Sequence, residues 1–219
     1  MSNYSSIAIL PATANIGTTA MSRPPGYERQ AVLNRATDVF WQRGYAATSV
    51  NHLVTATGLK PGSLYAAFGS KKGLFLEVLG DYNAAFLHDV EDCIATARGP
   101  LAAVRALLRR SADSTLGDSR RRGCLAVNAL LEMAGHDEDI AQTLRAHNEK
   151  LRRRLEQLLA DAREQGELEP ERDPRALSAF VMNNLWGMRV LCKSEPSRAA
   201  LDSIIDGVMQ GLGGTQPQA

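Results

Sequence analysis

The most constraining feature of this sequence is a run of short helical segments between residues 27 and 79, separated by tight breaks. Apolar residues at 31–40 recur with the spacing of one buried helical face. Gly44 then suits the backbone position that ends a helix. Thr48 or Ser49 can cap a second helix, and Gly58 closes it after about two turns.

A third and a fourth helix follow without a long connection. Pro61 suits the first turn of the third helix, where its missing N–H would have no partner anyway. Ser70 can cap a fourth, longer helix that starts at Lys71. Three short helices with a tight turn between the second and third predict a helix-turn-helix.

The third helix, "PGSLYAAF", is unusually slim on one side. In a helix-turn-helix the second helix of the pair lies in the DNA major groove, which is about 12 Å wide. Small residues at positions 62, 63, 66 and 67 would let its backbone approach the bases. This helix is therefore the predicted reading element.

The distribution of charged residues along the chain indicates a local DNA-binding surface. The whole chain carries a formal net charge of only +1. Residues 26–72, however, hold six Lys or Arg and two acids, so this segment carries +4 and the remainder is net acidic. A basic head on an acidic body fits a DNA-binding module joined to a second function.

Composition favours helices throughout. Aromatic residues make up only 5% of the chain, and no segment alternates with the period of a strand. No apolar run approaches the length of about 18 residues that a membrane span needs. The three cysteines lie far apart and form no CxxC pair, which indicates a reducing compartment, here the cytoplasm. We expect an all-α protein that takes no cofactor and binds no metal or membrane.

The segment "FWQRGYAATSVNHLVTATGLKPGSLYAAFGSKKGLFLEVL" resembles the DNA-binding domain of TetR-family transcriptional regulators. The resemblance implies an all-helical homodimer with a C-terminal ligand-binding and dimerisation domain. It also implies a repressor that a small-molecule effector releases from a palindromic double-stranded DNA operator. We divide the chain accordingly into a disordered arm (1–25), a helix-turn-helix domain (26–72) and a ligand-binding and dimerisation domain (73–213).

The same resemblance, with the local basic charge, assigns the DNA contacts. The second helix would contact phosphates at its start, and the third would face the groove. Tyr65 and Lys71 would hold the sugar–phosphate backbone, with Lys72 beside them. The predicted DNA-binding residues are Thr48, Ser49, Lys60, Pro61, Gly62, Ser63, Tyr65, Lys71 and Lys72.

The string "SRRRGCLAVNALLE" (119–132) is the most informative part of the C-terminal half. It resembles a TetR subgroup that includes the N-ethylmaleimide reductase repressor. Cys124 at a helix start behind three arginines could be a reactive thiolate or a small buried residue. Asn128 and Glu132 could line a pocket with it, or could tie helix ends together. His136 and His147 have no metal-like partners and are predicted to lie on the surface.

Helices at 174–193 and 197–211 are predicted to form the dimer interface. The first carries more apolar residues than one buried face needs, and family resemblance places a four-helix bundle there. The predicted interface residues are Phe180, Leu185, Trp186 and Met188. A dimer would space two reading helices about one turn of DNA apart, roughly 34–36 Å.

Three classes of function differ in what they require of the sequence. An effector-responsive repressor fits it best, with modification of Cys124 as an alternative switch. An enzyme would need a nucleophile with its base, a metal cluster or a phosphate loop, and the sequence shows no such arrangement. A sequence-independent DNA-binding protein would not need the close approach that the slim third helix permits.

Overall fold

A computed structural model describes residues 28–213, and every regular element in that range is a helix. No strand occurs among these residues, so the all-α prediction is confirmed. The helices are α1 (Arg29–Arg43), α2 (Val50–Thr57), α3 (Pro61–Phe68), α4 (Lys71–Thr96), α5 (Pro100–Gly117), α6 (Leu125–Met133), α7 (Glu138–Glu164), α8 (Pro174–Leu191), the short 3-10 helix η1 (Cys192–Ser194) and α9 (Arg198–Gly211).

The predicted helix boundaries in the first part of the chain rest on caps that the structure contains. Ser49 accepts a hydrogen bond from the backbone N–H of His52, and the His52 ring accepts one from the Ser49 N–H. Gly58 ends α2 with a φ of 74°, in the left-handed region that glycine adopts without strain. Ser70 caps α4 by accepting from the Gly73 N–H.

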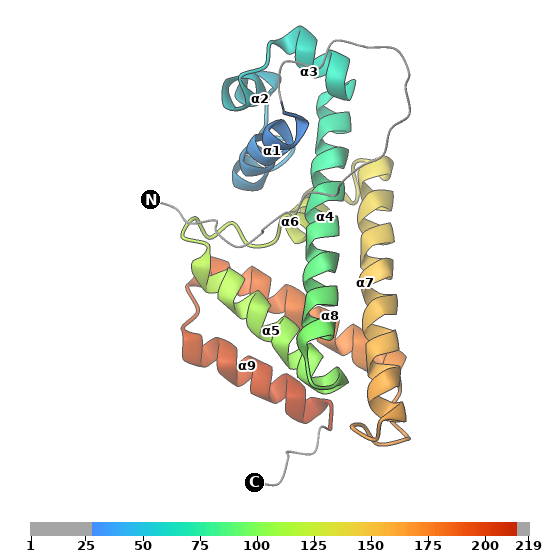
Figure 1. The fold of residues 1–219 in the computed structure, drawn as a ribbon. Coiled ribbons are helices and arrows are strands. Elements are labelled where there is room, and N and C mark those ends of the chain that lie inside the picture. The colour runs from blue at the N-terminus through green and yellow to red at the C-terminus, as the bar shows by residue number, and fades with distance from the viewer. Residues whose placement is uncertain (1–27, 214–219) are drawn as a thin grey trace.

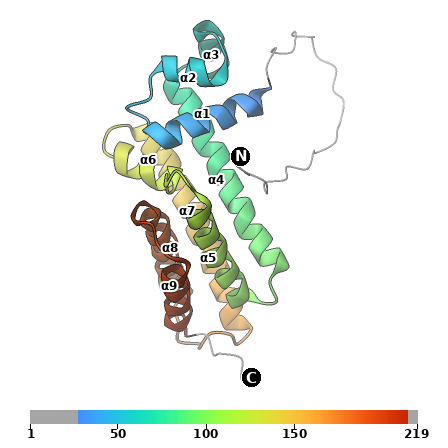
Figure 2. The ribbon, with the colours of Figure 1, turned by 90° about the vertical axis from the view of Figure 1, so that its left-hand side faces the viewer.

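The molecule is built around α4, which spans nearly its whole length (Figures 1 and 2). Helices α1, α2 and α3 cluster around the first turns of α4. Helices α5, α8 and α9 lie at its other end, and α7 runs beside it (Figure 1). The division proposed at residue 72 therefore falls inside α4, and this single helix belongs to both parts. The predicted arm at 1–25 lies outside the described residues.

Two hydrophobic clusters form the interior. The upper cluster joins the helix-turn-helix to α6 and the first half of α7, and it includes Phe40, Leu64, Phe75 and Leu144. The lower cluster joins the second halves of α4 and α7 to α5, α8 and α9. Helices α1–α3 with the first turns of α4 form the head, and the rest of the described chain forms the body. Because the upper cluster crosses from α1–α3 into α6 and α7, the head shares its core with the body.

The position of α8 corrects part of the predicted dimer interface. Leu185 and Met188 are 2% and 1% exposed and belong to the lower cluster of their own protomer. Trp186 packs partly against the same cluster. Phe180 packs near Gly211 of α9 but remains 39% exposed. The sequence shows that α8 is apolar on more than one face, but not which face the protomer itself covers.

His147 also departs from its prediction, since it is only 8% exposed. It lies in the buried stripe of α7, between Leu144 and Leu151. Burial, with a smaller effect from Lys150, lowers the pKa of the His147 imidazole to about 4. The ring is therefore neutral at neutral pH.

This burial predicts an acid-dependent loss of stability. Below its ordinary pKa of 6.5 a histidine in the unfolded chain binds a proton, whereas folded His147 stays neutral down to about pH 4. The free energy of unfolding should therefore fall as the pH drops through this window. Urea unfolding at pH 7 and pH 5 measures the effect. The drop should be smaller in His147→Phe, and an equal drop in both proteins would contradict the buried, neutral histidine.

None of the helices within residues 28–213 is long and apolar enough to cross a membrane.

Candidate nucleic-acid interface

Helix α3 presents one buried and one open side. Leu64 and Phe68 are buried in the upper cluster. Gly62, Ser63 and Tyr65 are exposed on the other side, with Tyr65 47% exposed. A Cβ added to Gly62 would meet nothing within 4 Å among residues 28–213, so no described side chain covers this part of the helix. The open side has the slim profile that the sequence predicts for a groove-facing helix.

The polar groups on this side have no internal partners. Within residues 28–213, Lys60, Ser63 and Tyr65 form no side-chain hydrogen bond or ion pair. Lys60 occupies the N-cap position of α3, and Pro61 follows in the first turn. The backbone N–H groups at such a helix start favour anions. These side chains therefore remain available for an external partner.

The two hydroxyls at the start of α2 are placed differently from each other. Thr48 is 1% exposed, and its hydroxyl donates to the Gly44 carbonyl at 2.6 Å. Its side chain therefore stabilises the α1–α2 turn, in contrast to the predicted phosphate contact. Ser49 is exposed and caps α2. Of the pair, only Ser49 has a side chain at the surface.

Lys71 bonds to the interior of the head. Its ammonium donates to the carbonyls of Tyr45 and Thr48, both at 2.9 Å, and lies 4.2 Å from the centre of the Tyr45 ring. It thus joins the start of α4 to the α1–α2 turn. These three internal contacts compete with the predicted contact between Lys71 and the DNA backbone.

Lys72 is paired with two acids at the start of α7. Its ammonium lies 2.6 Å from Asp139 and 3.3 Å from Asp137, the N-cap residue. Hydrogen bonds to these carboxylates raise the pKa of Lys72. Since Lys72 and Asp139 are exposed, the contribution of this ion pair to stability is small.

Replacing Lys71 with alanine should lower the free energy of unfolding by about 2 kcal/mol, because two charge-assisted hydrogen bonds are lost. Lys72→Ala, one residue away, should change stability little, since water screens its ion pairs. Urea unfolding of both variants measures the difference. If Lys71→Ala kept full stability and lost only affinity and salt dependence for DNA, Lys71 would be a phosphate contact after all.

Helix α6 is fastened directly to the head. The Glu132 carboxylate accepts from the backbone N–H of Tyr45 at 2.9 Å and of Ala46 at 2.7 Å, which lie 87 and 86 residues earlier in the chain. Asn128 donates to the Arg122 carbonyl at 2.8 Å. Of the two roles open for Asn128 and Glu132, these bonds favour tying helix ends together over lining a pocket.

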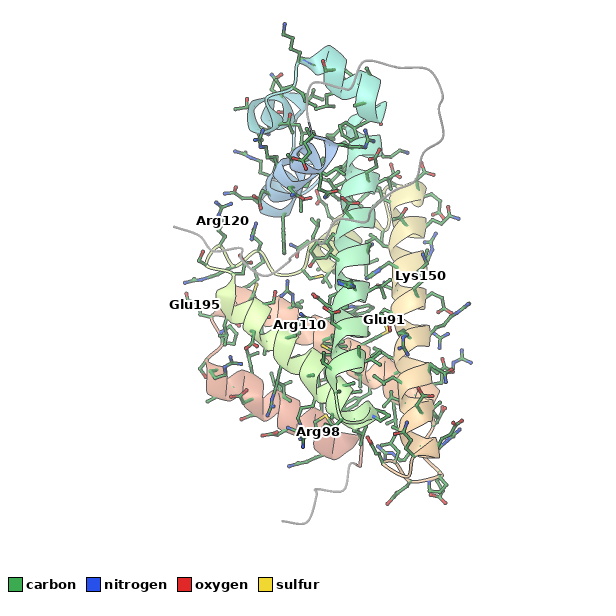
Figure 3. The ribbon with its side chains drawn as sticks, viewed as in Figure 1. Glu91, Arg98, Arg110, Arg120, Lys150 and Glu195 are labelled. Atoms are coloured by element: carbon green, nitrogen blue, oxygen red, sulfur yellow. The ribbon has the colours of Figure 1, made fainter. Side chains whose placement is uncertain are left out.

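A second connection between body and head runs through Arg122. This side chain is only 5% exposed and bonds Asp38 of α1 at 2.8 Å and Asp118 at 3.1 Å. Its guanidinium also lies 4.3 Å from the ring centre of Trp41. Figure 3 shows the neighbouring Arg120 in the same α5–α6 loop, on the side of the molecule nearest α1. The sequence alone does not distinguish Arg122 from its neighbouring arginines, because its partner on α1 is 84 residues away.

Cys124 occupies the N-cap position of α6 and is half-buried. Its sulfur accepts a hydrogen bond from the Tyr82 hydroxyl at 3.5 Å. Cys93 and Cys192 are buried, and burial raises the pKa of both thiols. No group of three or more His, Cys, Asp or Glu side chains within the described range could hold a metal ion.

Comparisons with known proteins agree with this geometry. Residues 32–78 match the family model for "Bacterial regulatory proteins, tetR family", and residues 100–208 match "Tetracyclin repressor-like, C-terminal domain". The HTH-type transcriptional repressor ComR of Escherichia coli is 32% identical over 83% of this chain and 87% of its own length. This chain belongs to the TetR family of transcriptional regulators.

Two further relatives cover most of the chain. The uncharacterised HTH-type transcriptional regulator YezE of Bacillus subtilis is 27% identical over 85% of this chain and 96% of its own length. Among solved structures, a cysteine mutant of the TetR family regulator CifR, in complex with 26-bp double-strand operator DNA, shares 32% identity. It has a TM-score of 0.78 and covers 86% of this chain and 98% of its own. Members of this family are regulators and not enzymes, as the sequence predicts.

Proposed function

We propose that this protein is a homodimeric repressor that binds a palindromic operator through α3 and leaves it when a small molecule binds in the C-terminal domain. The open side of α3 carries this proposal. Gly62 leaves room there for the helix backbone to approach the floor of the DNA major groove, and the side chains of Lys60, Ser63 and Tyr65 have no partner within the described residues. The operator complex of CifR supports it by similarity. A regulator of this kind would act in the cytoplasm.

The exposed residues of the head would make two kinds of DNA contact, to bases and to phosphates. Lys60 and Ser63 stand at the start of α3, where side chains reach base edges. Tyr65 within α3 and Ser49 at the N-cap of α2 are exposed and would hold phosphates, which fixes register without reading sequence. Thr48 and Lys71 would hold the α1–α2 turn in the shape that this docking needs.

The coupling to an effector would run through the connections between body and head. Glu132 holds the α1–α2 turn from α6, and Arg122 holds α1 from the α5–α6 loop. Because α4 continues from the head into the body, a shift of its second half also moves its first turns. A ligand that favours one arrangement of these helices would change the spacing of the two heads in the dimer.

The dimer would use the side of α8 that the protomer leaves open. Phe180, Val190 and Leu191 are 39%, 51% and 37% exposed on this helix. Gly187, also exposed, has no atom within 4 Å of where a Cβ would be, so a partner helix could approach closely. In the proposed interface, Gly187, Val190 and Leu191 join Phe180 and take the place of Leu185 and Met188.

Tyr65→Phe tests the phosphate assignment. Removing the hydroxyl should weaken binding by about 3- to 10-fold for operator and unrelated DNA alike, because a phosphate contact carries no sequence information. Stability should not change, since the hydroxyl has no partner among the described residues. Fluorescence anisotropy with both DNAs measures this, and a loss confined to the operator would instead make Tyr65 a base contact.

The "GCLxxNxxxE" string (123–132) supports membership of the N-ethylmaleimide reductase repressor subgroup. We favour a reversible ligand over modification of Cys124, because that sulfur is half-buried and already accepts from Tyr82. Cys124→Ser should therefore keep both operator binding and effector release. Loss of release in Cys124→Ser, with binding intact, would favour the thiol switch.

A further inference from the structure

Two facing core stripes of the body are each interrupted by one polar residue. On α4 the buried positions run Leu79, Asn83 and Val90, and on α7 they run Leu144, His147 and Leu151. Helical periodicity calls for an apolar residue at both interruptions. Asn83 is 6% exposed and His147 8%, so both polar side chains are taken out of water on folding.

The two residues lie at the same level of the body. The His147 ring packs edge-on against Phe86, with ring centres 6.3 Å apart. Phe86 follows Asn83 by three residues, on the same face of α4. Above this level the stripes belong to the upper cluster and below it to the lower cluster. Asn83 and His147 thus mark the boundary between the two apolar clusters.

Neither residue has a partner for its buried polar atom. The Asn83 Oδ1 and the His147 Nδ1 form no hydrogen bond with any described residue. A buried amide or imidazole without a partner is costly, and buried polar groups in native proteins are normally paired. By contrast Ser178, also buried, donates its hydroxyl to the Arg175 carbonyl.

We propose that Asn83 and His147 form the polar end of the effector site, and that the effector is a small uncharged molecule carrying a hydroxyl group. The assignment of this ligand as the effector rests on the proposed function. A hydroxyl can donate to the Asn83 Oδ1 and accept a hydrogen bond from His147 Nδ1–H, in the neutral tautomer that carries its proton on Nδ1. Its apolar remainder would lie against Phe86.

The charge of the surroundings selects an uncharged ligand. The His147 ring is neutral, since burial holds the pKa of its imidazole near 4. Lys150, the charged group that acts on it, is exposed, and Figure 3 shows it on the outer side of α7. A carboxylate placed against the neutral His147 ring would lose its water while Lys150 stays at the surface, so its burial would be unfavourable.

The test uses the full-length protein labelled with 15N-histidine and free of DNA, with 1-butanol as the probe and butyrate as its charged match. The ring signals of His147, assigned by their absence in His147→Phe, should shift with 1-butanol until they saturate. Butyrate should shift them at least ten-fold less. Asn83→Leu should weaken the 1-butanol response at least ten-fold, with Asn83→Ser as a second variant if leucine packs poorly. Ser178→Ala, the matched loss of a paired buried hydroxyl, should respond like the wild type.

A His147 shift that rises linearly with 1-butanol without saturating would overturn the proposed binding site. A shift that is equally large in both Asn83 variants would do the same. Asn83 and His147 would then be residues that bind internal water. A second arm measures operator affinity by fluorescence anisotropy. Saturating 1-butanol should weaken it several-fold in the wild type and not in Asn83→Leu. Saturation of the His147 shift without any change in operator affinity would overturn the effector role. Failure of the protein to bind any operator would instead refute the proposed function, because the NMR arm does not depend on DNA.

Discussion

Gly62→Leu should reduce operator affinity at least 100-fold while leaving the protein as stable as before or slightly more so. Gly62 lies on the open side of α3, where an added Cβ would meet no atom of the described residues within 4 Å. Replacing glycine inside a helix gains up to about 1 kcal/mol in helix propensity. A leucine would, however, hold the helix backbone away from the groove floor, and a 100-fold loss corresponds to about 2.8 kcal/mol of binding free energy.

Gly80→Leu is the matched control for this experiment. Gly80 is an exposed helical glycine of α4 where an added Cβ would also meet nothing within 4 Å, and it lies outside the helix-turn-helix. It should gain similar helix propensity and keep full operator affinity. Thermal unfolding and anisotropy on both variants separate the two effects. Normal operator binding by Gly62→Leu would mean that α3 does not enter the groove by this side.

Glu132→Ala should destabilise the protein by about 3 kcal/mol, because one carboxylate holds two backbone N–H groups of the α1–α2 turn. Each hydrogen bond to a charged group contributes about 1.5–3 kcal/mol, and removing the acceptor leaves the Tyr45 N–H without a partner in a partly buried position. Urea unfolding measures the loss. Hydrogen exchange at the Tyr45 and Ala46 amides should accelerate at the same time.

Two comparisons sharpen this result. Glu132→Gln keeps one acceptor oxygen and should lose roughly half as much stability. Glu138→Ala removes a carboxylate that is paired with Arg145 at the surface, and should change stability by less than about 0.5 kcal/mol. If Glu132→Ala matched Glu138→Ala, the head would not be fastened to α6 through this side chain.

The helix-turn-helix was predictable because its signals are local. Gly58, Pro61 and Ser70 each act on the backbone within a few residues, so their positions in the sequence determine where helices begin and end. The slim side of α3 follows in the same way from the residue types between them. No long-range contact is needed to reach that prediction.

Predictions that depend on distant partners were less successful. The sequence predicts a DNA contact for Lys71 and leaves two roles open for Glu132, whereas the fold brings both side chains to the α1–α2 turn. His147 is predicted at the surface because it has no metal-like partners in the sequence, although its spacing from Leu144 and Leu151 follows the buried stripe of α7. For α8 the sequence shows an excess of apolar residues, and only the packing of α5 and α9 shows that Leu185 and Met188 are already covered.

The central claim is that α3 reads a two-fold symmetric DNA sequence. To test it, the full-length protein is used to select bound fragments from random double-stranded DNA. We expect enrichment of one palindromic sequence with half-sites about one helical turn apart, roughly 34–36 Å. The selected sequence should change for Ser63→Ala. Binding that depends on salt but enriches no sequence would contradict readout by α3 and indicate a sequence-independent DNA-binding protein.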